Sequence, residues 1–310
     1  MNWERRRPFP VGHSRDHMSP FFTQGTLFKY GSLPSHVAFK SSPPRNHHHH
    51  VIAIGGLTDG LLFAGYLVPL ATALHHDPAS PCCLVQPLLT SSHQGWGLGS
   101  VSRDADELFL LAKELKSNHH SRGIVIVGQS TGCQDAVMYA RKYGTDEEAP
   151  PLLGVVLQAP VSDREYLGTL PTTPSALSKA QALVDAGRSD DVAFRAMDFD
   201  GAAIAATRWL SLAGKGGEDD MFSSDLSDDE LKAQLGCLRD INTLLLLSAD
   251  DEYVPKHVDY VGLGNRMVRA VGDGGKVQMA VEGGNHGLSE HPQEAADIIS
   301  TFILDSCIHK

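Results

Sequence analysis

The amino-acid sequence predicts an α/β fold, in which helices flank a mostly parallel central sheet and one helical insertion interrupts the chain. Apolar runs typical of buried strands alternate with amphipathic segments between residues 51 and 160. The strand pattern resumes at residue 241, after a stretch that breaks the rhythm. Because strands that alternate with helices usually pair in parallel, this order predicts one sheet with an insertion at about residues 161–238.

The composition is that of a globular protein. Of its 310 residues, 42% are hydrophobic and 20% are charged. The formal net charge of -11 argues against nucleic acid as a partner, because phosphate binding needs a basic face. No apolar run reaches transmembrane length, and the first residues lack the apolar core of a secretory signal. Five cysteines without metal or redox spacing favour reduced thiols. We therefore expect a cytoplasmic protein without stable membrane insertion.

The first fifty residues are expected to contain an irregular lead-in, one edge strand of the sheet and a loop. Residues 1–35 have no clean periodicity and predict an irregular lead-in, with one edge strand near Thr26–Tyr30. The main domain is expected at residues 36–310. Residues 41–50 predict an exposed loop, because Pro43-Pro44 and the run His47–His50 stand before the next strand.

The remaining elements follow from apolar periodicity. Leu108, Leu111 and Leu115, for example, recur at helical spacing. The expected strands lie at 36–40, 51–56, 82–89, 124–127, 152–157, 241–248 and 277–281. The expected helices lie at 61–74, 101–116, after Gly132, near 174–186 and 202–212, and at 291–307. Inside the insertion, the acidic stretch 216–226 predicts a solvated loop, and Ser227 with Glu230 fits a capping box.

One tight turn carries the strongest functional signal. Gly128-Gln129-Ser130-Thr131-Gly132 fits the G-x-S-x-G pattern and stands between a β-branched strand and a helix. A serine on such a strained turn projects its hydroxyl from the sheet edge, and glycines allow the close backbone approach. Cys133 is expected to pack beneath the turn, so Ser130 is the predicted nucleophile.

A serine nucleophile needs a base and an orienting carboxylate. Asp251 and His286 each follow a predicted strand, in the chain order Ser, Asp, His that α/β-hydrolases use. All three therefore lie at the C-terminal edge of one parallel sheet. Asp251 precedes Pro255 by four residues and is favoured over the adjacent Asp250 as the acid. His286, in a glycine-flanked loop, is favoured over His291 as the base.

The glycine pair after the strand at 51–56 predicts half of an oxyanion hole. We expect the backbone N–H groups of Leu57 and Thr131 to be its two donors. The residues expected to contact substrate are Gly56, Thr58, Gln129 and Trp96. Trp96 lies in a loop whose alternate glycines do not fit a dinucleotide-binding fingerprint. This chemistry requires neither a metal nor an organic cofactor.

Seven segments together resemble a known family of α/β-hydrolases, which includes fungal siderophore esterases of the fusarinine C hydrolase type. These segments are IGGLTDG (54–60), GQSTGCQD (128–135), LQAPVSDRE (157–165), RWLSL (208–212), DDMFSSDL (219–226), SADDEYVP (248–255) and GGNHGLSE (283–290). The resemblance implies a serine esterase with Ser130 as nucleophile, acting on a small-molecule ester such as a siderophore. Two alternatives stay open from the sequence: an acyltransferase on the same scaffold, and a non-catalytic small-molecule binding protein.

Overall fold

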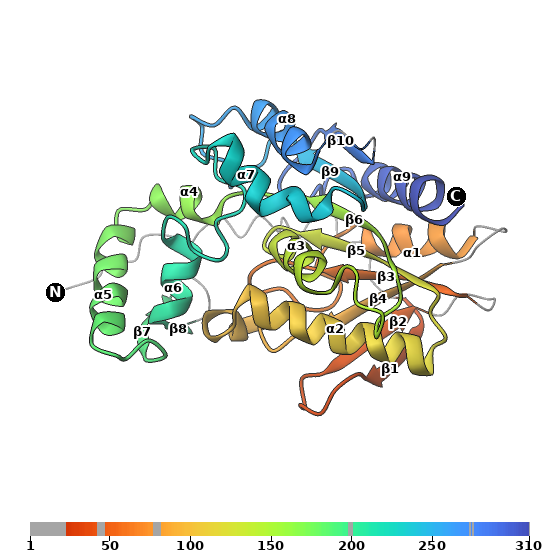
Figure 1. Cartoon of the computed structure of the whole chain (residues 1–310), viewed down its shortest axis with the longest axis horizontal. Helices are drawn as coiled ribbons and strands as arrows, with labels where there is room; N and C mark the ends of the chain where they lie inside the picture. Colours follow the sequence, from red (N-terminus) through yellow and green to blue (C-terminus); the bar gives the residue numbers. More distant parts are fainter. Residues whose placement is uncertain are drawn as a thin grey trace.

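The computed structural model describes residues 23–41, 47–76, 82–197, 201–272, 274 and 276–309. An eight-stranded sheet with the order β1-β2-β4-β3-β5-β6-β9-β10 forms its centre (Figure 1). The strands of this sheet are β1 (Gly25–Lys29), β2 (Val37–Ser41), β3 (His49–Ile54), β4 (Cys82–Leu88), β5 (Gly123–Gln129), β6 (Leu152–Gln158), β9 (Asn242–Ser248) and β10 (Val277–Glu282).

Most of the sheet is parallel, as the alternating pattern predicts. β4, β3, β5, β6, β9 and β10 pair in parallel, and only β2 runs antiparallel to its two neighbours, β1 and β4. β1 is the edge strand expected near residues 26–30, and it lies within residues 1–35, the expected irregular lead-in. Residues 1–22 of that lead-in fall outside the described residues, as does Pro43-Pro44.

Helices cover both faces of the sheet because its central strands are apolar on both sides. Along β3, Ile52 and Ile54 pack in the core beneath α2 and α3, whereas Val51 and Ala53 pack beneath α1 and α9. The helices on the first face are α2 (Val101–Asn118), α3 (Gly132–Tyr143), α7 (Asp228–Leu235) and α8 (Tyr260–Val271). Those on the second face are α1 (Leu67–His76) and α9 (Pro292–Phe302), and α9 continues into a π-helical turn, η5 (Ile303–Ile308).

Three expectations for the first hundred residues are wrong. The helix expected from residue 61 begins only at Leu67, because turns that include Leu62 at a φ of +58° precede it. The histidine run is not an exposed loop: His49 and His50 belong to β3, and His50 is buried with its Nδ1 2.9 Å from Ser121 Oγ. The expected loop around Trp96 is a short 3-10 helix, η2 (His93–Leu98).

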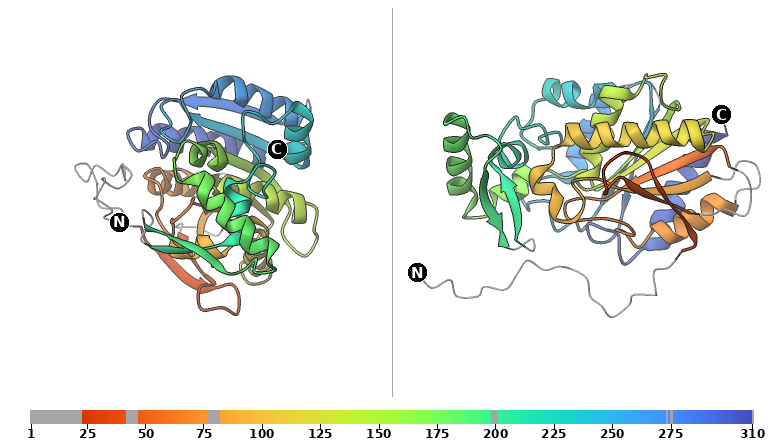
Figure 2. Two further views of the ribbon diagram at one scale, coloured as in Figure 1. Left: turned by 90° about the vertical axis from the view of Figure 1, so that its left-hand side faces the viewer. Right: turned by 90° about the horizontal axis from the view of Figure 1, so that it is seen from below.

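The first part of the chain between β6 and β9 forms a separate layer with its own small core. It contains α4 (Asp163–Gly168), α5 (Thr173–Asp185), β7 (Val192–Ala196), β8 (Ala202–Ala205) and α6 (Ala206–Ala213). The later part, α7 and the 3-10 turn η4 (Gly236–Leu238), packs on the main core of the sheet. The expected helix at 202–212 is therefore half strand, because residues 202–205 pair with β7 in an antiparallel hairpin. α5, α6 and this hairpin lie together at one end of the molecule (Figure 2). Their core includes Leu167, Ile204 and Trp209.

Across the described residues, every helix is too short or too polar to traverse a lipid bilayer.

Candidate active site

Ser130 lies on a strained turn between β5 and α3. Its φ of +56° is unusual for a residue with a side chain. Both flanking glycines are required by close backbone contacts. A Cβ on Gly128 would lie 2.1 Å from the carbonyl oxygen of Gly132, and one on Gly132 would lie 2.6 Å from that of Ile54. The G-x-S-x-G segment therefore has the geometry of a nucleophile elbow.

Cys133 packs beneath this turn, as expected. Its Sγ donates to the carbonyl oxygens of Gly128 and Gln158, at 3.3 and 3.2 Å. Burial raises the pKa of the Cys133 thiol well above its ordinary value. The thiol therefore stays protonated and is a poor nucleophile.

Asp251 and His286 meet at the ends of two neighbouring strands. Asp251 follows β9 and His286 follows β10, and these strands are parallel partners. Asp251 Oδ2 lies 2.8 Å from His286 Nδ1, and both residues are buried. The backbone N–H of Tyr253 donates to the second oxygen of Asp251, at 3.0 Å. Asp250 is exposed, and its backbone N–H donates to Gly284. The structure thus brings Asp251, not Asp250, to His286.

Several groups fix the position of His286. Its backbone N–H donates to Glu252 Oε2 at 2.8 Å, and its carbonyl accepts from Gln158 Nε2 at 2.9 Å. The Tyr253 ring packs edge-on against the imidazole, with centroids 4.6 Å apart. Tyr166 of α4 packs in turn against Tyr253, at 4.9 Å. The segment between β6 and β9 therefore reaches the immediate surroundings of the histidine.

The pKa of His286 is raised above its ordinary value. Burial by itself would lower this pKa, because it disfavours the imidazolium. The hydrogen bond to Asp251 and the charge of that carboxylate outweigh burial, and the charges of Glu252 and Asp163 act in the same direction. The site is therefore built to stabilise a protonated imidazole.

The loop after β3 approaches the elbow closely. A Cβ on Gly56 would lie only 2.6 Å from Ser130 Cβ, so no side chain fits there. The carboxylate of Asp59 braces the loop by accepting from the N–H of Gly56 at 2.8 Å. Leu57 and Thr131 line one shared cavity beside this contact.

Of the residues expected to contact substrate, only some face that cavity. Gly56 and Trp96 line it, and Trp96 is buried rather than in an open loop. Thr58 is exposed and has a φ of +70°. Gln129 is buried within the elbow. Neither Thr58 nor Gln129 belongs to the lining.

The cavity has charged walls that the sequence reasoning missed. Asp104, Asp135 and Arg208 line it together with Gly56, Leu57 and Thr131. A signal for Asp104 was available, because it stands four residues before Leu108 on the apolar face of α2. Asp135 likewise belongs to the buried face of α3. Arg208 comes from α6, far away in sequence, so only the fold brings it here.

Arg208 is held in a buried ion pair. Its NH1 donates to both oxygens of Asp219, at 2.7 and 2.6 Å, and its Nε donates to the carbonyl of Trp96 at 3.0 Å.

The two aspartates of the cavity have raised pKa values. Burial raises the pKa of Asp104 to about 7, and the charges of Glu107 and Asp219 raise it as well, whereas the hydrogen bond from Ser91 and the charge of Arg208 lower it. The pKa of Asp135 is raised well above its ordinary value, again chiefly by burial.

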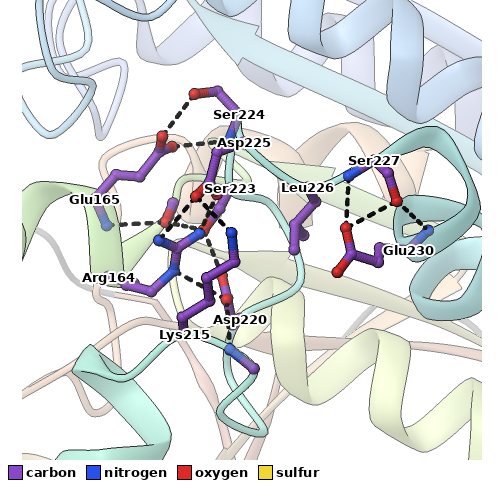
Figure 3. A network of polar contacts seen from close by, with 12 residues as sticks. Arg164, Glu165, Lys215, Asp220, Ser223, Ser224, Asp225, Leu226, Ser227 and Glu230 are labelled. Atoms are coloured by element: carbon purple, nitrogen blue, oxygen red, sulfur yellow. Dashed lines mark hydrogen bonds and ion pairs between the residues drawn. The ribbon is translucent and has the colours of Figure 1, made fainter.

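The acidic stretch 216–226 is not the solvated loop that we expected, because Asp219 and Asp220 are buried. Figure 3 shows how this stretch is tied to α4. Arg164 pairs with Asp220 at 2.9 Å and also with Asp225. Glu165 accepts from the N–H and hydroxyl of Ser224, at 2.9 and 2.6 Å. The capping box expected at Ser227 and Glu230 is confirmed in the same region.

A metal-binding group of three or more His, Cys, Asp or Glu side chains does not occur within the described part of the chain.

Comparisons with known proteins add the following findings. A family described as "Protein of unknown function (DUF1749)" matches residues 18–304. A fusarinine C esterase, sidJ, of Aspergillus fumigatus is 31% identical over 299 residues, covering 78% of this chain and 84% of that protein. An esterase of Emericella nidulans is 29% identical over 300 residues, which cover 78% of this chain and 79% of that protein. The solved structure of the siderophore hydrolase EstB from Aspergillus fumigatus superposes with a TM-score of 0.73 at 27% identity. The match covers 93% of this chain and 98% of the EstB chain.

Proposed function

This chain belongs to the DUF1749 family, and from this membership and the geometry of its site we propose that it is a serine carboxylesterase with Ser130, His286 and Asp251 as its triad. The contact between Asp251 and His286, at 2.8 Å, is the observation that carries the proposal. A buried carboxylate on Nδ1 holds the imidazole tautomer that leaves Nε2 as a base.

In the proposed reaction, the Ser130 hydroxyl attacks the ester carbonyl while His286 takes its proton. The tetrahedral oxyanion accepts hydrogen bonds from the N–H groups of Leu57 and Thr131, each worth about 3–4 kcal/mol in such sites. His286 then gives its proton to the departing alcohol, which leaves an acyl ester on Ser130. Water, deprotonated by His286, cleaves that ester and releases the acid. The contact between Gly56 and Ser130 supports this arrangement.

The proposed substrate is a small-molecule ester, including siderophore-like esters because two relatives are named for such activity. We further propose a cytoplasmic location and an α/β-hydrolase domain that comprises residues 36–310, with residues 161–238 as its cap, together with β1, which pairs in the same sheet. The net charge of -11 supports a partner other than nucleic acid.

Labelling with a fluorophosphonate probe tests the nucleophile directly. Wild-type protein is expected to be labelled at Ser130, as mapped by mass spectrometry, and the Ser130→Ala variant is expected to stay unlabelled. Cys133→Ala, which removes the buried thiol, should retain the label. A folded wild-type protein that is never labelled would count against the esterase. Product analysis with added alcohols then separates hydrolysis, which yields the free acid, from acyl transfer, which yields a new ester.

A further inference from the structure

The cavity beside the elbow contains two carboxylates with unused hydrogen-bonding capacity. Asp104 and Asp135 both line it and are only 6% and 5% exposed. Within the described part of the chain, Oδ1 of each accepts no hydrogen bond. Ser91 hydrogen-bonds to the carboxyl of Asp104 but leaves that oxygen unused. Buried acceptors of this kind are costly unless a ligand, a proton or water satisfies them.

The charge balance around these carboxylates favours a cation. Among the residues that line the cavity, Arg208 is the cationic side chain, and Asp219 already holds it in a bidentate pair. Glu107 on α2, which itself pairs with Arg103 at 3.3 Å, adds negative potential at Asp104. Glu218, in the loop after α6, adds it at Asp135. The lining of the cavity therefore has more carboxylates than its one guanidinium neutralises.

The size of the cavity restricts the kind of cation. Its volume is about 30 Å³, which accommodates one or two groups of the size of a water molecule. A primary ammonium is of that size and presents three donors. A guanidinium is larger, and a metal ion would call for the three-ligand cluster that is absent from the described residues. A primary ammonium therefore fits both the volume and the acceptors.

We propose that this cavity is a subsite for a protonated primary amine of the substrate, held by Asp104 and Asp135 a few bonds from the ester carbonyl. The inference rests on the proposed esterase function, because Leu57 and Thr131 line the same cavity and are the proposed oxyanion donors. The substrate class is thus an ester whose acyl part carries an ammonium group, as amino-acid esters do.

Binding of the ammonium is linked to proton release. Without a ligand, burial favours protonated carboxyls at both positions. The charges of Glu107 and Asp219 act in the same direction at Asp104, against Ser91 and Arg208. The charges of Asp104, Asp219 and Glu218 do so at Asp135, against Arg208. An ammonium favours the ionised forms, so its binding displaces protons. Affinity for an alkylammonium, whose own pKa is about 10, is therefore expected to rise with pH from about 6 to 8, around the pKa of about 7 of Asp104.

Pairs of esters that differ only in charge test the subsite. A 2-aminopropanoyl ester is compared with the 2-methylpropanoyl ester of the same alcohol, and 3-amino and 4-amino homologues are compared with their alkyl isosteres. In the wild type, kcat/KM is expected to be about tenfold or more higher for the ammonium member of at least one pair. This is the ratio that one hydrogen bond to a charged group provides. Asp104→Asn and Asp135→Asn should each reduce that ratio about tenfold. Asp106→Asn, an exposed change on the same helix, should leave the ratio unchanged.

The outcomes separate the subsite from the esterase. Hydrolysis of both members of every pair at equal rates would overturn the subsite and leave the esterase intact. Failure to hydrolyse any ester, together with absent probe labelling, would reject the esterase itself. If the asparagine variants do not fold, competitive inhibition of the wild type by propylammonium is measured against 1-butanol. Stronger inhibition by the amine that increases with pH supports the subsite, and equal inhibition contradicts it.

Discussion

Replacement of Gly56 by alanine is the most direct test of the contact between the β3 loop and the nucleophile. The added Cβ would lie 2.6 Å from Ser130 Cβ and 2.9 Å from Ser130 Oγ, whereas ordinary contacts begin at 3.4 Å. The loop or the elbow must therefore retreat by about 0.8 Å, and misplacement of reacting groups by about 1 Å can cost about 100-fold in rate. We expect kcat/KM for a small ester to fall by about this factor.

The assay is steady-state hydrolysis of a chromogenic ester, with thermal unfolding measured in parallel to show that the variant is folded. Gly168→Ala is the matched control, because a Cβ at that position meets nothing within 4 Å. It should hydrolyse the ester at the wild-type rate. An unchanged kcat/KM for Gly56→Ala would refute the reasoning, since it would mean that hydrolysis does not depend on the close contact between this loop and Ser130.

Three further predictions concern charges in and near the site. Asp251→Asn should lower kcat by about 10⁴-fold because it favours the wrong imidazole tautomer, while Asp250→Asn, its exposed neighbour, should have little effect in the same ester assay. The acid limb of the pH profile of kcat/KM should lie above the ordinary pKa of histidine, because only neutral His286 acts as a base and its pKa is raised; a limb below that value would contradict the assignment. Arg208→Met should reduce the free energy of unfolding in urea by about 3–5 kcal/mol, because it leaves Asp219 buried without its partner, and a loss close to zero would show that the pair is not needed.

The sheet and the nucleophile elbow were predictable because their signals are local. The β-branched run before Ser130 and the glycines around it are constraints on adjacent residues, so they are visible in the sequence. The choice of Asp251 over Asp250 followed from the spacing to Pro255, and the geometry agrees with it. The assignment of roles to these residues stays a prediction until it is tested.

The buried ion pairs beside the cavity were not predictable in the same way. Asp219 and Asp220 stand in a polar, acidic stretch, and such stretches are usually solvated. Their burial depends on two arginines: Arg208 on α6 and Arg164 on α4. These pairings arise only once the chain is folded. Likewise, the histidine run has no apolar pattern of its own, and His50 is buried because β3 lies between β4 and β5.

The late position of β9 and β10 in the chain has a consequence for biosynthesis. During translation the elbow at Ser130 leaves the ribosome long before the strands that carry Asp251 and His286. Because chains are synthesised from the N-terminus, a partly made protein has the serine turn without its base. A polypeptide that stops before β9 therefore lacks the base and the acid of the proposed triad, and β9 and β10 complete the machinery.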